Sequence, residues 1–215
     1  MTAPETIAGV VLAAGSSTRM GHNKLLLELA GETLVRRAVR AAVTARLDPV
    51  IVVLGHEAER VGAQLDGLPC LPLLNPRFGE GVRTSLQAGV TRAAESAGAL
   101  VVVLADMPFV TAEMIESVVA RYRESGAPLV VSHYGDDVDA PPILYDRSLF
   151  AELLAIPEDR CAKQVVRRHR GEAAVVTWPA QALRDVDIPE DYEEVRAQLS
   201  NLGPSEGPSP PAARG

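Results

Sequence analysis

The stretch Val10–Lys24, VVLAAGSSTRMGHNK, decides the fold class of this chain. An apolar run that starts at Ile7 ends at Gly15, and small hydroxyl residues, an arginine, a second glycine and a lysine follow. This order is typical of a buried strand that opens into a polar, cationic loop, and in open α/β sheets such strand ends bind ligands. Glycines let the backbone approach a phosphate, while Arg19 and Lys24 supply positive charge. We therefore predict that the loop binds a nucleoside triphosphate.

Further apolar runs alternate with helix-like segments along the first two thirds of the chain. Because these runs are continuous rather than alternating, they predict strands buried on both faces, and so a mostly parallel sheet between helices. The expected strands are 7–13, 49–55, 70–74, 99–105 and 128–132, and the expected helices are 33–46, 56–65, 82–96 and 111–124. The strand 99–105 is the most hydrophobic, so we expect it at the centre of the sheet. The predicted fold class is α/β, with a three-layer, Rossmann-like arrangement.

The last third of the chain is less regular. It predicts strands at 141–145 and, at a sheet edge, 173–177, helices at 147–155, 160–169 and 189–199, and an extended piece at 185–188. We expect one domain over residues 1–200. Residues 201–215 are rich in Pro, Gly and Ser, and we expect a disordered tail there.

Composition excludes several classes of function. Aromatic residues make up only 4% of the chain and the net charge is −7, which argues against a nucleic-acid partner. No apolar run approaches the length of a membrane span, and no signal sequence is present, so we expect a cytoplasmic protein without a membrane partner. Cys70 and Cys161 are far apart and are expected to be reduced. No apolar heptad or dimer strand is evident, so we expect a monomer or a weak dimer.

A second polar cluster, Ala105–Phe109, follows the predicted central strand and reads ADMPF. A carboxylate at Asp106 points into the crevice above the sheet, and Pro108 stiffens the turn that carries it. Because this strand ends at the same edge as the loop at Gly15, Asp106 is a candidate ligand for Mg²⁺. The alternative is an aspartate that caps a helix or a turn.

The pattern L-A-A-G-x-S-x-R-M-G-x-x-K, Leu12–Lys24, is neither a Walker A motif nor G-x-G-x-x-G. It resembles the signature of nucleotidyltransferases, and within them the molybdenum cofactor cytidylyltransferase group, over residues 5–199. The resemblance implies the nucleotide-diphospho-sugar transferase type of fold. It implies that Arg19 and Lys24 neutralise the triphosphate and that the loop binds it through Leu12, Ala13, Ala14, Gly15 and Ser16. Guanylyl-transferring relatives carry L-A-G-G here, so Ala14 favours CTP.

The resemblance also implies a pair of metal ligands. Asp185–Tyr192 is similar to the family's D-x-D-x-P-E-D run, whose second aspartate joins the first on the metal. Here these residues are Asp187 and Asp106, and Mg²⁺ is the implied cofactor. Taken alone, the run is also an ordinary acidic helix start.

Two further segments resemble parts of the family's substrate sites. The segment 75–86 is similar to a G-x-x-x-S-L motif, which makes Gly81 and Ser85 nucleotide-binding candidates and leaves Arg83 for the acceptor's phosphate. A capping serine and a solvated arginine are the alternatives. Relatives line the acceptor site with a G-x-P run, and Pro141 is the matching proline, but Asp139 stands where they carry glycine. With Asp136 and Asp137 upstream, we expect an acidic wall that repels an anionic pterin phosphate.

The implied reaction moves CMP from CTP onto the phosphate of a molybdopterin-type cofactor and releases pyrophosphate, with Arg19, Lys24 and Asp106 as the catalytic residues. An ionised phosphate needs no strong general base to attack, so catalysis rests on positioning and charge. One alternative is transfer from CTP, GTP or UTP to a sugar phosphate or another small phosphorylated metabolite. Another is a non-catalytic maturation factor that binds nucleotide or cofactor. A molybdoenzyme client is a further expected partner.

Overall fold

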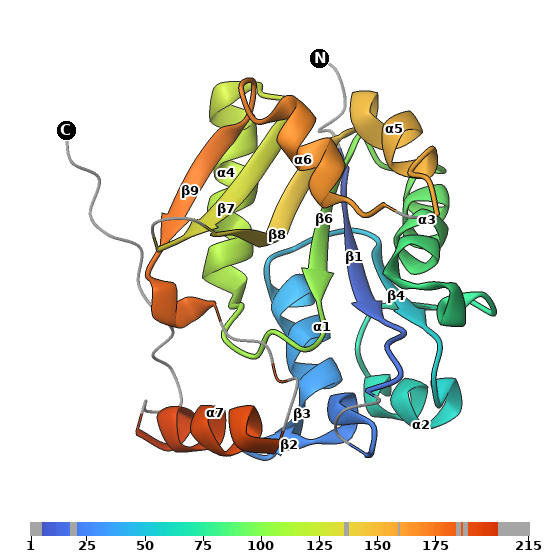
Figure 1. The fold of residues 1–215 in the computed structure, drawn as a ribbon, viewed down its shortest axis with the longest axis vertical. Helices are drawn as coiled ribbons and strands as arrows, with labels where there is room; N and C mark the ends of the chain where they lie inside the picture. The colour runs from blue at the N-terminus through green and yellow to red at the C-terminus, as the bar shows by residue number, and fades with distance from the viewer. Residues whose placement is uncertain are drawn as a thin grey trace.

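A seven-stranded sheet runs through the molecule in the order β5-β4-β1-β6-β8-β7-β9 (Figure 1). The structure is a computed structural model, and it describes residues 6–17, 21–135, 138–158, 160–183, 186 and 189–201. The strands of the large sheet are β1 Ile7–Ala13, β4 Val50–Leu54, β5 Leu71–Leu74, β6 Ala99–Leu104, β7 Leu129–Tyr134, β8 Val138–Asp146 and β9 Ala174–Trp178. Strand β8 pairs antiparallel with β6 and β7, and every other pair is parallel. The predicted mostly parallel sheet is confirmed, with β6 at its centre.

Helices cover both faces of this sheet and make three layers (Figure 1). Helices α1 and α4 share one apolar core with Val11 of β1, whereas α3, α5 and α6 share the other with Val10. The side chains of neighbouring strand residues thus enter opposite cores, as a strand buried on both faces requires. The helices are α1 Leu34–Thr44, α2 Ala58–Gly62, α3 Val82–Ala93, α4 Ala112–Ser125, α5 Phe150–Leu154, α6 Lys163–His169 and α7 Pro189–Asn201. Short 3₁₀ turns are η1 Lys24–Leu26, η2 Ala63–Leu65, η3 Phe78–Glu80, η4 Arg147–Leu149 and η5 Ala180–Ala182.

Local sequence explains several of these boundaries. The side chain of Thr111 accepts a hydrogen bond from the backbone N–H of Met114 and so caps α4 at its start. Gly126 ends the same helix in the left-handed conformation, with φ of 62°. Gly89 has a packing role instead, because a Cβ at this position would lie 2.3 Å from Cγ1 of Val10. Its missing side chain lets α3 lie directly against β1.

Some elements differ from the prediction. The two-residue strands β2 Glu28–Leu29 and β3 Glu32–Thr33 form a small hairpin that was not predicted, because such short strands show no periodicity. Helix α7 packs beside this hairpin, where Val195 joins a small apolar cluster (Figure 1). It ends at Asn201, the residue at which the expected tail begins. Residues 202–215 lie outside the described residues, and so does the extended piece 185–188 apart from Val186. Within the described chain, none of the helices has the length and apolar composition needed to cross a membrane.

Candidate active site

The loops that follow β1 and β6 leave the sheet side by side. Leu12 and Leu104 are register partners in these two parallel strands, and the N–H of Ala105 donates to the carbonyl of Leu12 at 3.1 Å. The strand order also reverses here, because the chain builds outward from β1 to β4 and β5 on one side and to β6 on the other. A reversal of this kind opens a crevice at the carboxyl ends of the strands. The expected meeting of the glycine loop with Asp106 at one sheet edge is confirmed.

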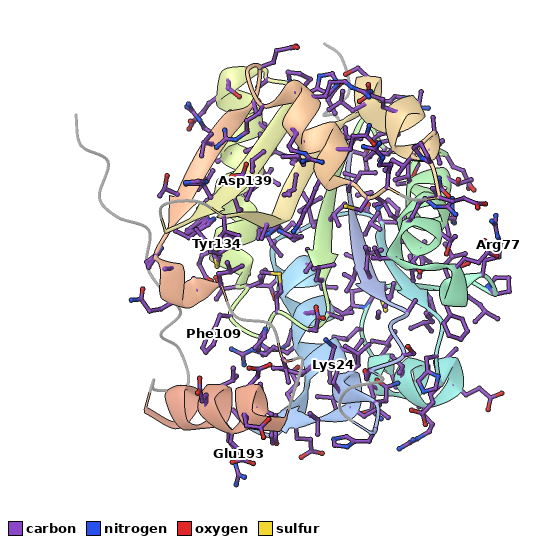
Figure 2. All side chains as sticks on the ribbon, in the orientation of Figure 1. Lys24, Arg77, Phe109, Tyr134, Asp139 and Glu193 are labelled. Atoms are coloured by element: carbon purple, nitrogen blue, oxygen red, sulfur yellow. The ribbon has the colours of Figure 1, made fainter. Side chains whose placement is uncertain are left out.

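An ion pair joins the two loops. Nζ of Lys24 lies 2.7 Å from Oδ2 of Asp106, and the two side chains are only 11% and 24% exposed. The backbone of Lys24 is fixed as well, since its N–H donates to Oγ of Ser17 at 3.1 Å and Asn23 caps the short turn η1 through the N–H of Leu25. Figure 2 shows Lys24 near the carboxyl end of β6. A mostly buried cation and carboxylate interact more strongly than an exposed pair, so the Lys24–Asp106 pair is a strong charge–charge interaction in the crevice.

A first cavity of about 440 Å³ opens around this ion pair. Its volume is within the range of small-molecule sites. Its walls come from the β1 loop, from the loop before α3, and from the end of β6: Leu12, Ala14, Gly15, Ser16, Ser17, Lys24, Phe78, Gly79, Gly81, Val82, Ser85, Leu104 and Asp106. The structure thus brings together eight predicted site residues: Leu12, Ala14, Gly15, Ser16, Lys24, Gly81, Ser85 and Asp106. The side chain of Ala13 instead is buried in the core shared with α1.

Asn75 orients the predicted residue Ser85. This asparagine is buried, and its Nδ2 donates to Oγ of Ser85 at 3.0 Å and to Oγ1 of Thr84 at 2.9 Å. Its Oδ1 accepts from the N–H of Arg77, which fixes the orientation of the amide. The Ser85 oxygen therefore accepts from Asn75, and its own proton is available for a ligand in the first cavity. Asn75 was not predicted as a functional residue, although its place directly after a predicted strand was a usable signal.

A second cavity of about 570 Å³ adjoins the first. The two share Leu12, Val82 and Leu104 as lining residues, so they meet above β1 and β6. Arg83 and Pro141, the predicted acceptor residues, both line the second cavity and not the first. The remaining walls are Leu86, Val102, Val138, Asp139, Ile143, Tyr145, Cys161, Ala162, Lys163, Val166 and Arg167.

Asp139 does line the second cavity, but its charge is compensated. Nε of Arg170 donates to Oδ2 of Asp139 at 2.8 Å, and Nδ1 of His133 lies 2.8 Å from Oδ1 (Figure 2 labels Asp139). The guanidinium of Arg170 thus offsets the carboxylate, which weakens the repulsion of an anionic acceptor expected from this residue. Asp136 and Asp137, the other residues of that expected wall, lie outside the described residues.

One predicted catalytic residue and one predicted metal ligand are beyond what the structure describes. Arg19 and Asp187 both lie outside the described residues, as does Asp185. The N–H of Val186 donates to the backbone carbonyl of Asp106 at 3.1 Å, so the chain passes beside Asp106 one residue before position 187. Among the described residues, no group of three or more His, Cys, Asp or Glu side chains could hold a metal ion. Asp106 is thus the described part of the predicted metal site.

The sheet and its helices have the nucleotide-diphospho-sugar transferase type of fold, and the sequence is that of a nucleotidyltransferase. Residues 9–174 match the MobA-like NTP transferase domain. The chain belongs to this family, so the predicted family and fold type are confirmed.

Relatives and solved structures agree with this assignment. The purine catabolism protein PucB of Bacillus subtilis (strain 168) is 34% identical over 207 residues, which cover 90% of this chain and 98% of PucB. The crystal structure of a Mycobacterium tuberculosis Rv0371c homolog, from Mycobacterium sp. strain JC1, is 31% identical with a TM-score of 0.77, covering 91% of this chain and 98% of that one. Rv0371c of Mycobacterium tuberculosis, solved in complex with manganese, is 26% identical with a TM-score of 0.74, covering 89% and 98%.

Proposed function

We propose that this nucleotidyltransferase moves CMP from CTP onto the phosphate of a molybdopterin-type cofactor and releases pyrophosphate. The observation that carries the proposal is the Lys24–Asp106 ion pair in the wall of the first cavity, at 2.7 Å, with the second cavity directly beside it. A transferase of this kind needs a charged donor site and an acceptor site that meet at the reacting phosphorus. The shared residues Leu12, Val82 and Leu104 supply that junction.

The first cavity takes the nucleotide in this proposal. Backbone N–H groups at Gly15 and Ser16 donate to the triphosphate, and Lys24 offsets the charge that builds on the leaving pyrophosphate. Arg19 is proposed to share that role. The hydroxyl of Ser85, held by Asn75, donates to the ribose or the base. Ala14 supports CTP rather than GTP, as the family motif implies.

Asp106 is proposed to hold Mg²⁺ together with Asp187. A hard cation prefers oxygen ligands and commonly takes one or two carboxylates plus substrate phosphates and water, which fits a partly exposed Asp106 in the cavity wall. The manganese complex of Rv0371c supports a divalent ion in this family. When bound, such an ion lowers the repulsion between the triphosphate and an anionic nucleophile.

Chemistry then requires only placement of the two substrates. An ionised oxygen of the acceptor phosphate attacks the α-phosphorus of CTP in line, a new P–O bond forms, and the bond to pyrophosphate breaks. Lys24 receives the negative charge that moves onto the leaving group. Because no proton must be removed from an ionised phosphate, the mechanism needs no general base.

The second cavity supports an acceptor with a ring body. Aliphatic side chains such as Leu86, Val102 and Ile143 form much of its wall, and a sugar would find few hydrogen-bond partners against them. Arg83 provides a cation for the acceptor's phosphate, and Asp139 no longer opposes it because Arg170 is paired with it. A molybdoenzyme that receives the product remains the proposed client.

Pyrophosphate release tests the proposal. The purified protein is incubated with Mg²⁺, a molybdopterin-type acceptor and CTP, GTP or UTP in turn, and we expect release with CTP that depends on both the metal and the acceptor. Asp106→Asn should reduce turnover by a factor of about 100 or more, whereas the matched control Asp66→Asn, at an exposed site, should not change it. Nucleotide binding without pyrophosphate release would support a non-catalytic binder instead. Release of pyrophosphate with a sugar phosphate but not with the pterin would show that the proposed acceptor is wrong.

A further inference from the structure

Arg83 lines the second cavity and follows Val82, a residue that both cavities share. It is the second residue of α3 and is 9% exposed. Its Nη1 donates to Oε1 of Gln87 at 3.0 Å, but its buried Nε has no hydrogen-bond partner among the described residues. A buried guanidinium nitrogen without a partner is unfavourable unless a ligand supplies the acceptor. Since a guanidinium offers five N–H donors in a planar fork, a phosphate group is the ligand that matches it best.

Gln87 holds this guanidinium from one helical turn further along α3. Its Oε1 accepts from Arg83, while its Nε2 donates to the carbonyl of Leu154 at 2.8 Å and lies 3.4 Å from the carbonyl of Ile156. The amide thus uses both ends. One end orients Arg83, and the other anchors the segment after α5 to α3.

The anchored segment precedes α6, which also lines the second cavity. Lys163 and Arg167 of α6 line this cavity, and both are exposed at its rim. Together with Arg83 they supply three cations around a largely aliphatic space. Asp139 is the one carboxylate among the described lining residues, and Arg170 offsets it. The cavity therefore carries net positive charge around apolar walls.

We propose that Gln87 is a positioning residue that sets acceptor specificity: it fixes the Arg83 guanidinium so that the second cavity selects a dianionic phosphomonoester attached to a flat ring. The same ring without phosphate, and a sugar phosphate, bind more weakly. The inference rests on the proposed function in taking the second cavity as the acceptor site. It goes further by assigning the selection to two side chains of α3.

Binding of a stable surrogate tests this directly. Pyridoxine 5′-phosphate carries a phosphomonoester on a flat ring and lacks a reactive aldehyde, pyridoxine is the same ring without phosphate, and glucose 1-phosphate is a sugar phosphate. Calorimetric titration of the full chain should show that pyridoxine 5′-phosphate binds about tenfold or more tightly than the other two. Arg83→Met should remove the preference over pyridoxine, while Arg92→Met, a matched change at a half-exposed site on the same helix, should keep it.

Two substitutions separate the functions of Gln87. Gln87→Glu keeps an oxygen for Arg83 but loses the donor to Leu154, whereas Gln87→Met loses both. We expect Gln87→Met to weaken binding of pyridoxine 5′-phosphate by about tenfold and Gln87→Glu to restore part of it. Binding of CTP with Mg²⁺ should stay unchanged in every variant, because neither Arg83 nor Gln87 lines the first cavity.

Three results overturn the inference. They are equal binding of all three ligands by the unaltered protein, unchanged binding by Arg83→Met, and loss of CTP binding in parallel with loss of the surrogate. The proposed function fails separately, through an absence of pyrophosphate release from CTP by the unaltered protein with the molybdopterin-type acceptor.

Discussion

Replacing Gly89 by alanine tests whether the contact between α3 and β1 holds the candidate site in place. A Cβ at this position would lie 2.3 Å from Cγ1 of Val10 and 3.3 Å from Cγ2 of Val53. Carbon atoms in favourable contact are about 3.5–4.0 Å apart, so the first of these contacts is roughly 1 Å too short. Val10 is fully buried and its β-branched side chain has little rotational freedom. Helix α3 must therefore move away from the sheet.

Two opposing terms set the size of the effect. Overpacking a close-packed interior costs about 1–3 kcal/mol, whereas alanine in place of glycine in a helix contributes about 1 kcal/mol of stability. Because the overlap with Val10 is severe, the overpacking cost lies near the upper end of its range, and we expect a net loss of about 2 kcal/mol in the free energy of unfolding. The displacement also carries Ser85 away from the β1 loop, so nucleotide binding should weaken.

Gly62→Ala is the matched control. This glycine has helical backbone angles, φ −60° and ψ −38°, and a Cβ there would lie 3.5 Å from Cδ1 of Leu54, an ordinary contact. With space for the methyl group, the same substitution should stabilise the protein by about 0.5–1 kcal/mol. Urea unfolding measures both variants, and the change in Tm on adding CTP with Mg²⁺ measures the site.

Two outcomes would refute this reasoning. A Gly89→Ala protein as stable as the unaltered one would show that α3 is not held by the contact at Val10. A destabilised protein with an unchanged response to CTP would show that the packing of α3 and the geometry of the first cavity are independent.

Two further predictions concern single hydrogen-bonded or charged pairs. Lys24→Met should weaken CTP binding by about tenfold or more, as measured by titration. Unchanged binding would show that the pair with Asp106 has a purely structural role. Tyr122→Phe removes a hydrogen bond of 2.6 Å to Asp146. Burial raises the pKa of this carboxyl, but its hydrogen bonds from Ser148 and Tyr122 lower the pKa by more, so it lies below the usual 3.8. A carboxyl whose pKa is lowered on folding adds stability at a pH above its unfolded-state pKa, and this stability is lost as the pH falls through the folded-state pKa. Tyr122→Phe should therefore cost about 1–2 kcal/mol at pH 7 and less below about pH 4. Urea unfolding at both pH values checks this, and a cost of equal size at both would contradict it.

Much of the fold was predictable because its signals are local. The strand 7–13 coincides with β1, and the cap at Thr111 and the stop at Gly126 bound α4 as expected. Each of these depends on neighbouring residues: a continuous β-branched run, a hydroxyl before a helix, a glycine after it. The central place of β6 followed from its hydrophobicity, since the middle strand of a layered sheet is the most completely buried.

Pairings between distant parts of the chain were not predictable in this way. An apolar run such as 141–145 does not encode its direction, and only the pairing of β8 with β6 and β7 shows that it is antiparallel. The charge of Asp139 was evident from the sequence, but its pairing with Arg170 was not, because Arg170 lies on another element. In the site, the motif predicted Lys24 and the strand end predicted Asp106. Their direct contact, and the hydrogen bonds that Asn75 and Gln87 make, could be seen only in the three-dimensional structure.

In the proposed function, the two cavities divide the chain between two tasks. Every described residue that lines the first cavity lies between Leu12 and Asp106, whereas the second takes much of its wall from Val138 to Arg167. Substitutions in the later segment can therefore alter which acceptor is taken while the donor machinery stays intact. A chimera that exchanges residues 138–170 between family members should exchange acceptors and keep the nucleotide. Under the proposed function, such a division lets acceptor choice change through one segment while nucleotide activation stays the same.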